Sequence, residues 1–119
     1  MSRFLARPAT TLITVAPTGA EQRKDDVPQL PTTPEEIAAE AAACEAAGAA
    51  MIHIHVRDAA HEPTLDLPRV REVVAAVRES SSLVVQLSTG GSVHDPMPER
   101  LRVLDADGVA AAQDVLVTP

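Results

Sequence analysis

Strand-like and helix-like segments alternate along this chain, and that alternation restricts its fold more than any other feature. Aliphatic and β-branched runs at 11–15, 51–56 and 83–87 predict three strands, each followed by polar residues. Helical patterns follow the first two strands, and a further short helix is expected from about Asp95 to about Leu104. Such alternation is typical of parallel βα units, so we predict an α/β fold with its chemistry at the carboxyl ends of the strands.

The helix after the first strand has clear start and stop signals. Thr33 is the expected N-cap, Pro34 occupies the first helical position, and Glu36 completes a capping box. Gly48 is placed to end this helix as the glycine after its C-cap. Apolar residues recur at helical spacing in both helices, and Cys44 is interpreted as a small core residue rather than a nucleophile. The two sets are Ile37, Ala41 and Cys44, and Val70, Val73, Val74 and Val77.

Charge and cysteine content exclude several classes of protein. The 119 residues include 17 acidic and 10 basic side chains, a net charge of −7, which argues against a nucleic-acid-binding protein. No apolar run reaches the roughly 18 residues that a membrane helix needs, and Met1 to Thr10 lack the apolar segment of a secretory signal. Cys44 is the only cysteine, so we expect no intrachain disulfide and a cytoplasmic location.

Two histidines on the second predicted strand are the strongest candidates for chemistry. His53 and His55 stand two residues apart, so on a strand their side chains share one face, and Arg57 follows there if the strand continues. Two imidazoles at this spacing can converge on one metal ion, and zinc suits them. The alternative is a pair of polar residues on an exposed face. Because Ile52, Ile54 and Val56 mark the other face as buried, the metal site is favoured.

Charged residues follow the first and second strands. Glu21 is a candidate third metal ligand or a group that binds a cationic substrate, and the alternative is a solvated loop carboxylate. Arg57 and Asp58 are expected to pair with each other or to orient a histidine by a hydrogen bond, and a plain surface ion pair is equally compatible with the sequence.

A small polar turn follows the third strand. Ser88 and Thr89 supply hydroxyl groups, and Gly90 and Gly91 allow backbone N–H groups to approach an anion closely, although an ordinary turn has the same composition. The two remaining histidines, His61 and His94, lie in predicted loops without a partner at metal-ligand spacing, so we expect both to be solvated.

Five blocks in order resemble the 3-keto-5-aminohexanoate cleavage enzyme family, also called β-keto acid cleavage enzymes. They are APTGAE at 16–21, LPTTPEEI at 30–37, AGAA at 47–50, HIHVRD at 53–58 and QLSTGG at 86–91. The resemblance implies a zinc-containing (β/α)8 barrel that converts a β-keto acid and acetyl-CoA into acetoacetate and a new acyl-CoA. It also implies a role in lysine degradation and a homo-oligomer for the full-length enzyme, with no nucleic-acid or membrane partner.

The resemblance assigns roles to individual residues. His53 and His55 match the two histidine zinc ligands, and Glu21 matches the glutamate that contacts the amino group of the substrate. Ser88 and Gly91 match positions that hold the carboxylate end of the substrate, with Arg57, Asp58, Thr89 and Gly90 as supporting residues. The family's third zinc ligand, a glutamate, and its probable catalytic base are expected from the C-terminal part of the barrel, which these 119 residues do not match.

The resemblance also divides the chain. We expect an N-terminal extension at 1–10, three to four βα units of an unclosed barrel at 11–104, and a divergent or frame-shifted tail at 105–119. Two alternatives remain open. One is an inactive fragment or pseudogene product. The other is a metal-dependent hydrolase of the amidohydrolase type, which also carries His-x-His on a barrel strand but needs no CoA.

Overall fold

A three-stranded parallel sheet organises the computed structural model, which describes residues 10–90 and 94–105. The strands are β1 (Thr14–Val15), β2 (Met51–Ile54) and β3 (Val84–Leu87), in the spatial order β1-β2-β3. Each connection passes through a helix, α2 (Pro34–Ala46) or α3 (Leu67–Ser80). The predicted α/β fold with parallel strands is therefore confirmed, although all three strands are shorter than the apolar runs that predicted them.

The α2 helix begins as its sequence predicts. The Thr33 side chain accepts a hydrogen bond from Glu36 N, and the Glu36 carboxylate accepts one from Thr33 N, each at 3.2 Å. These bonds satisfy two of the backbone donors that a helix leaves unpaired at its start. At the other end Ala47 is the C-cap, and Gly48 has a φ of +110°, a conformation that a glycine adopts without steric cost.

The α3 helix starts with a side-chain cap from Asp66, which the sequence alone did not indicate. The Asp66 carboxylate accepts from Arg69 N at 3.3 Å, and Pro68 lies in the first turn. All four valines of the predicted stripe are buried. Beyond β3 lie α4 (Met97–Arg102), which has no buried residue, and a 3-10 turn η1 (Val103–Asp105). Both fall within the short helix expected near 95–104, apart from Asp105.

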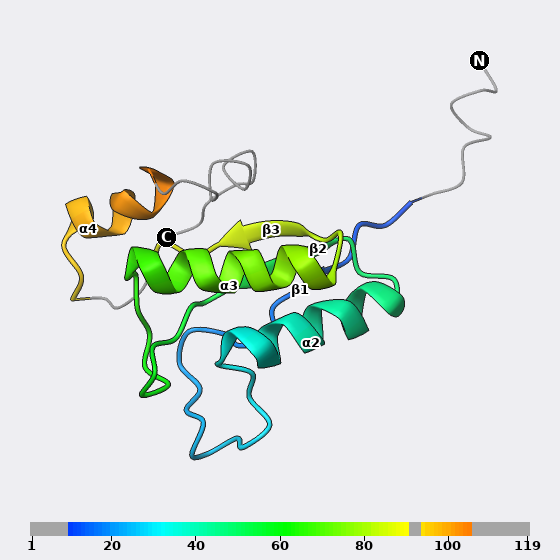
Figure 1. The fold of residues 1–119 in the computed structure, drawn as a ribbon, viewed down its shortest axis with the longest axis horizontal. Helices are drawn as coiled ribbons and strands as arrows, with labels where there is room; N and C mark the ends of the chain where they lie inside the picture. Colours follow the sequence, from blue (N-terminus) through cyan, green and yellow to red (C-terminus); the bar gives the residue numbers. More distant parts are fainter. Residues whose placement is uncertain (1–9, 91–93, 106–119) are drawn as a thin grey trace.

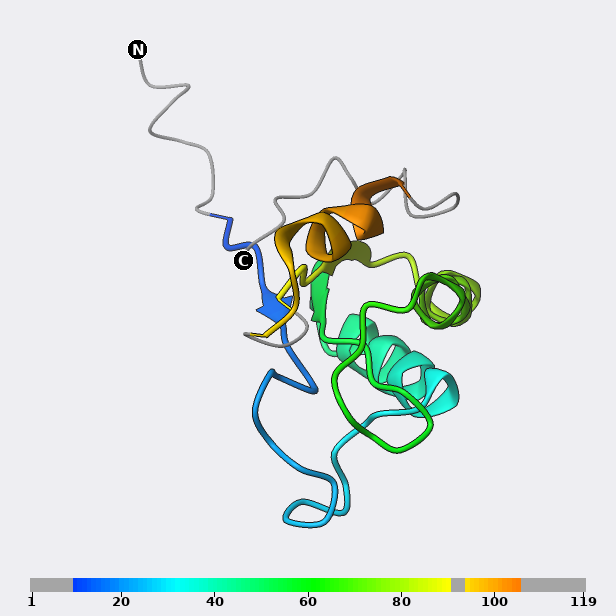
Figure 2. The same cartoon turned by 90° about the vertical axis from the view of Figure 1, so that its left-hand side faces the viewer.

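The core lies between the sheet and the two long helices. Figures 1 and 2 show α2 and α3 side by side on one face of the sheet, with α4 away from them beyond β3. Ile52 and Ile54 of β2 point into this core, and each fully buried side chain of this size contributes about 1.5–3 kcal/mol. The cluster is completed by Ile37, Ala41, Val56, Val70, Val73, Val74, Val77, Leu83, Val85, Leu87 and Val103. Cys44 is only half-buried and lies outside this cluster, so its expected place in the core is wrong.

The opposite face of the sheet holds the polar side chains. The parallel register pairs His53 with Gln86, and it pairs the buried Ile52 with Val85. Because successive residues of a strand point to opposite faces, His53 and Gln86 lie on the face away from α2 and α3. No helix within 10–90 and 94–105 is long and apolar enough to cross a membrane.

Candidate functional site

His53 and His55 converge at the carboxyl end of β2. Their Nε2 atoms lie 3.2 Å apart, and the ring centroids are separated by 5.0 Å with an interplanar angle of 72°. The strand ends at Ile54, one residue before His55, yet the alternation of side chains persists far enough to bring both imidazoles together. The predicted convergence of the two rings is therefore confirmed.

Gln86 orients the first ring of the pair. Its Oε1 lies 2.8 Å from His53 Nδ1, across the register that pairs the two residues. An amide oxygen only accepts, so Nδ1 carries the proton and His53 Nε2 presents its lone pair. A histidine that donates one ring N–H to an oxygen acceptor is the usual arrangement of a metal ligand. The sequence alone did not point to Gln86, although its place opposite His53 follows once the strands are aligned.

The surroundings of His55 favour its neutral form. Burial lowers the pKa of this imidazole, and the nearby His53 and Arg57 lower it further. A neutral imidazole is the form that binds a metal, because a proton on the ligating nitrogen blocks coordination. The environment of the pair therefore favours a neutral imidazole that can bind a metal over a protonated one.

The two rings fit two positions of a zinc site. Nitrogen ligands about 2.0–2.1 Å from a tetrahedral zinc ion lie about 3.3–3.4 Å from each other, close to the separation seen here. Across the described residues, no group of three histidine, cysteine, aspartate or glutamate side chains is arranged to hold a metal ion. The pair therefore offers two of the three protein ligands that a catalytic zinc site needs.

Glu21 lies in the loop after β1, and its side chain is exposed. It lines a hollow of about 230 Å³ together with residues of the loop after β2, among them Arg57, His61 and Glu62. The structure therefore brings Glu21 beside the segment that follows the histidine pair. It does not join Glu21 to His53 and His55 in one cluster of metal-binding groups, so the expected third-ligand role is not supported.

Arg57 is buried, and the surface ion pair that the sequence allowed is wrong. Only 2% of the residue is exposed, and its guanidinium donates to the backbone carbonyls of Gly19, Gln22 and His61. Asp58 instead accepts from the backbone N–H groups of Ala60 and Glu62, at 2.8 and 3.0 Å, and so stabilises the turn after β2.

His61 is not the solvated side chain that the sequence suggested. It is half-buried, and its Nδ1 lies 2.7 Å from Thr32 Oγ1, just ahead of α2. His61 also has a φ of +66°, which is unusual for a residue with a side chain. His94 is exposed, as expected.

The turn after β3 has a defined hydrogen-bond pattern. Ser88 and Thr89 are both buried, and Ser88 N donates to Ile54 O at 3.0 Å. Gly90 N donates to Ser88 Oγ at 3.0 Å, so this N–H serves the turn itself. The Ser88 hydroxyl accepts this bond through its oxygen, so its own O–H can still act as a donor. Gly91 lies outside the described residues.

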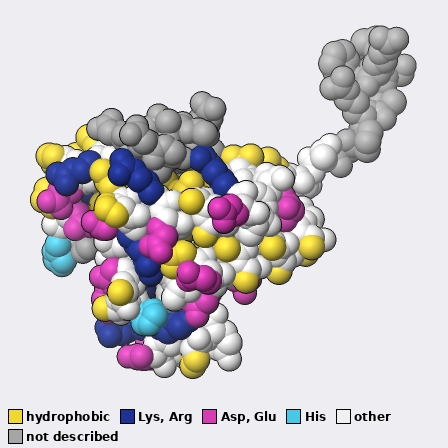
Figure 3. All heavy atoms as spheres, viewed as in Figure 1, with side chains coloured by type: hydrophobic (Ala, Val, Ile, Leu, Met, Phe, Trp, Pro, Cys, Tyr) yellow, Lys and Arg dark blue, Asp and Glu magenta, His cyan; other side chains and the backbone are white. Residues whose placement is uncertain are grey.

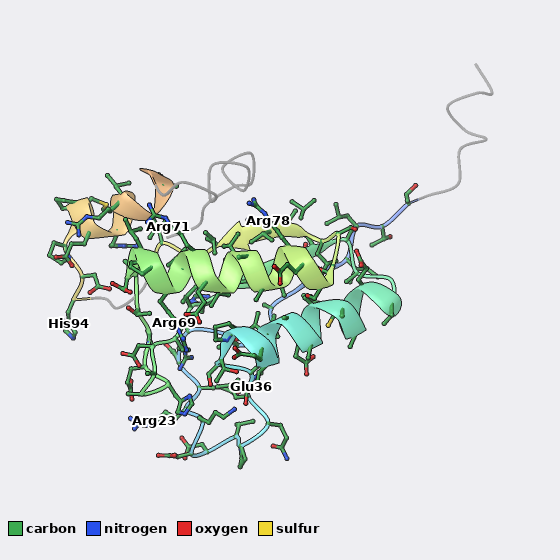
Figure 4. All side chains as sticks on the ribbon, viewed as in Figure 1. Arg23, Glu36, Arg69, Arg71, Arg78 and His94 are labelled. Carbon is green, nitrogen blue, oxygen red and sulfur yellow. The ribbon has the colours of Figure 1, made fainter. Side chains whose placement is uncertain are left out.

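Salt bridges and hydrogen bonds tie these loops to α2. Figure 4 shows Glu36 in the first turn of α2, beside the loop that carries Arg23. Lys24 of that loop donates to both carboxylate oxygens of Glu36, at 2.8 and 2.9 Å, and to Leu30 O at 2.7 Å. Figure 3 shows acidic and basic side chains interspersed over the same face of the molecule. The cap at Glu36 was predictable from the sequence, whereas the contact with Lys24 was not.

Comparison with known proteins gives a consistent result. The family model described as beta-keto acid cleavage enzyme matches residues 10–116. The 3-keto-5-aminohexanoate cleavage enzyme of Fusobacterium nucleatum is 45% identical over 92 residues, which cover 76% of this chain and 34% of that protein.

Two further relatives carry different names. The 3,5-dioxohexanoate:acetyl-CoA acetone transferase of Paraburkholderia graminis is 38% identical over 99 residues, covering 82% of this chain and 32% of that protein. The 3-oxoadipate:acetyl-CoA acetyltransferase of Cupriavidus necator is 36% identical over 81 residues, covering 67% and 28%. The chain thus spans about a third of the length of these curated relatives.

Proposed function

Because the chain belongs to the β-keto acid cleavage enzyme family, we propose that the protein exchanges acyl groups between a β-keto acid and acetyl-CoA. The products are acetoacetate and a new acyl-CoA. The names of three relatives, which specify 3-keto-5-aminohexanoate, 3,5-dioxohexanoate and 3-oxoadipate, support a β-keto acid as the substrate class. The observation that carries the proposal is the convergence of His53 and His55 at the carboxyl end of β2.

We propose zinc as the metal that this pair holds. The support comes from the separation of the two Nε2 atoms, the Gln86 acceptor behind His53, and the lowered pKa of His55. When bound, zinc polarises the keto carbonyl of the substrate as a Lewis acid. In this proposal His53 and His55 supply two ligands, and a glutamate from the remainder of the family's barrel supplies the third.

The residues of this chain would bind and orient the substrate at its two ends. Glu21, exposed at the rim of its hollow, is proposed to contact a cationic group such as the amino group of 3-keto-5-aminohexanoate. The Ser88 hydroxyl, with Gly91 beyond it, is proposed to bind the carboxylate. Thr89, Gly90 and Asp58 have supporting roles, since Asp58 and Ser88 shape the turns after β2 and β3. No base is assigned among these residues.

The architecture proposed for the whole protein is a (β/α)8 barrel. Residues 11–104 would form its first βα units, with the face that holds His53 and Gln86 as the interior. This assignment is supported by the parallel order β1-β2-β3 and by α2 and α3, which cover the same face of the sheet. We also propose that the protein forms a homo-oligomer in the cytoplasm and acts in lysine degradation. We place the end of this part of the barrel near residue 104.

The test is an assay of the protein as its gene encodes it, with a β-keto acid in the presence of acetyl-CoA or of water alone. We expect acetoacetate and a new acyl-CoA to form only with acetyl-CoA. His53→Ala and His55→Ala should each abolish most of the activity and the bound zinc, while His94→Ala, on an exposed histidine, should retain both. Cleavage without CoA would contradict the proposal and favour a metal-dependent hydrolase.

A further inference from the structure

Arg57 is buried without an acidic partner. It is 2% exposed, and within the described residues its guanidinium forms no ion pair and its Nε has no hydrogen-bond partner. Burial lowers the pKa of this group, and the nearby Glu62 carboxylate opposes that change. Burial of a cation is costly unless polar groups replace its water, and three backbone carbonyls do this for the Arg57 guanidinium.

These contacts join two loops at the carboxyl ends of the strands. Nη1 donates to His61 O at 3.0 Å, in the loop after β2. Nη2 donates to Gly19 O at 2.9 Å and to Gln22 O at 3.1 Å, in the loop after β1. Glu21 lies between Gly19 and Gln22, so one nitrogen of Arg57 holds the backbone on both sides of it.

In each of the two loops, a residue near this guanidinium has a positive φ. Gly19 has a φ of +72°, and His61 has a φ of +66°, which costs a residue with a side chain about 1 kcal/mol or more. His61 is held there by its carbonyl bond to Arg57 and by its ring contact with Thr32. Such strain persists where surrounding contacts over-determine the backbone, and it is concentrated at functional sites.

We propose that Arg57 is a positioning residue that fixes the Glu21 loop against the strand carrying the histidine pair. It thereby sets the preference for a β-keto acid with a cationic group over a neutral one. This inference rests on the proposed function for its effect on substrates, but not for its effect on the loop. A lysine cannot reproduce it, because an ammonium is a compact point charge without the planar fork that reaches two loops at once.

The first measurement is hydrogen exchange, which needs no substrate. We expect Arg57→Lys to raise the exchange rates of the loop amides of Asp26, Val27 and Leu30 by about tenfold, since their bonds lie inside the released loop. Exchange in α3 should stay unchanged, which separates local release from unfolding. Arg71→Lys, the same substitution at an exposed position of α3, is the matched control. Unchanged loop exchange in Arg57→Lys overturns the inference.

The second measurement is the ratio of kcat/KM for an amino-substituted β-keto acid to that for a neutral analogue of equal length. We expect Arg57→Lys and Glu21→Gln each to lower this ratio by about tenfold, mainly through KM for the amino substrate. The double variant should lower the ratio little further than either single variant, because both substitutions remove the same contact between Glu21 and the substrate. Equal losses with both substrates would mean that Arg57 acts on the common part of the substrate, and would overturn the inference.

Gly19→Ala provides an independent variant in case Arg57→Lys does not fold. An added Cβ meets nothing within 4 Å but strains the positive φ, so it disturbs the loop and spares the core. We expect faster loop exchange and a lower substrate ratio here too, and no change in either would contradict the inference. If the wild-type protein cleaves no β-keto acid, the proposed function fails, and hydrogen exchange alone decides whether Arg57 positions the loop.

Discussion

At the scale of single residues, one carboxylate connects three parts of the chain. Glu36 Oε2 accepts from Thr32 N at 2.8 Å and from Lys24 Nζ at 2.9 Å, in addition to its capping bond with Thr33. The hydrogen bond from Lys24, followed by that from Thr32, lowers the pKa of Glu36 from 4.5 to about 2. Glu36 thus anchors the loop that carries Glu21 to the start of α2.

We expect Glu36→Gln to lower the free energy of unfolding by about 1 kcal/mol at pH 7, a value discounted because the side chain is partly exposed. The folded-state pKa is depressed, so the stabilisation is complete above 4.5 and is lost as the pH falls toward 2. Urea unfolding at several pH values should show the difference between wild type and variant shrinking over that window. Glu35→Gln, at an exposed neighbour in the same turn, is the control. A difference independent of pH would contradict this role.

At the scale of the elements, β2 and β3 each have one buried face and one more open face. Val84 and Val85 are adjacent in β3, yet Val84 is 47% exposed and Val85 is 3% exposed. The buried side packs against α2 and α3 through the valine stripe of α3, and the open side carries the site. The helices therefore stabilise the sheet from one side and leave the other side available for polar groups.

Val85→Ala and Val84→Ala form a matched pair on this strand. We expect Val85→Ala to lower the free energy of unfolding by about 1.5–3 kcal/mol, because it leaves a cavity beneath the helices. In the chain of 119 residues, Val84→Ala should cost no more than about 0.5 kcal/mol, as usual for an exposed position. Both variants lose the same strand propensity, so the difference between their free energies of unfolding measures the effect of burial. Equal costs in denaturant unfolding would show that β3 is buried on both faces.

At the scale of the whole molecule, segments far apart in sequence meet at the carboxyl ends of the strands. Arg57 reaches carbonyls 35 and 38 residues away, and His61 contacts Thr32 across 29 residues. Thr18 Oγ1 donates to Pro31 O at 2.8 Å and joins the end of β1 to the segment before α2. These contacts hold the loop after β1, the loop after β2 and the segment before α2 together at one edge of the sheet.

Metal binding at this edge should stabilise the fold. Zinc at about 100 times its dissociation constant should raise the free energy of unfolding by about 2.7 kcal/mol, because it binds only the folded arrangement. Gln86→Ala should weaken zinc binding by about 10–100-fold through the loss of the acceptor behind His53. Thermal unfolding across a zinc titration measures both effects, with Gln29→Ala, at an exposed residue, as the control. Unfolding that does not depend on zinc would contradict the metal site.

Contacts within a few residues made much of this structure predictable. The capping box of α2, the glycine after it, the valine stripe of α3 and the convergence of His53 with His55 all depend on spacings of two to four residues. The alternation of elements predicted parallel strands, since a crossover helix between two strands leaves them parallel. What failed locally were the lengths of the strands and the place of Cys44, which depend on neighbours across the fold.

The sequence by itself determined the α/β class, the boundaries of α2 and the shared face of the two histidines, because local sterics and periodicity decide them. Only the tertiary structure decided that Arg57 is buried, that His61 is held by Thr32 and that Gln86 orients His53. The residues next to a polar side chain in sequence do not reveal whether it pairs on the surface or donates to distant carbonyls. The partner groups lie 29 to 38 residues away, and packing alone brings them within hydrogen-bond distance.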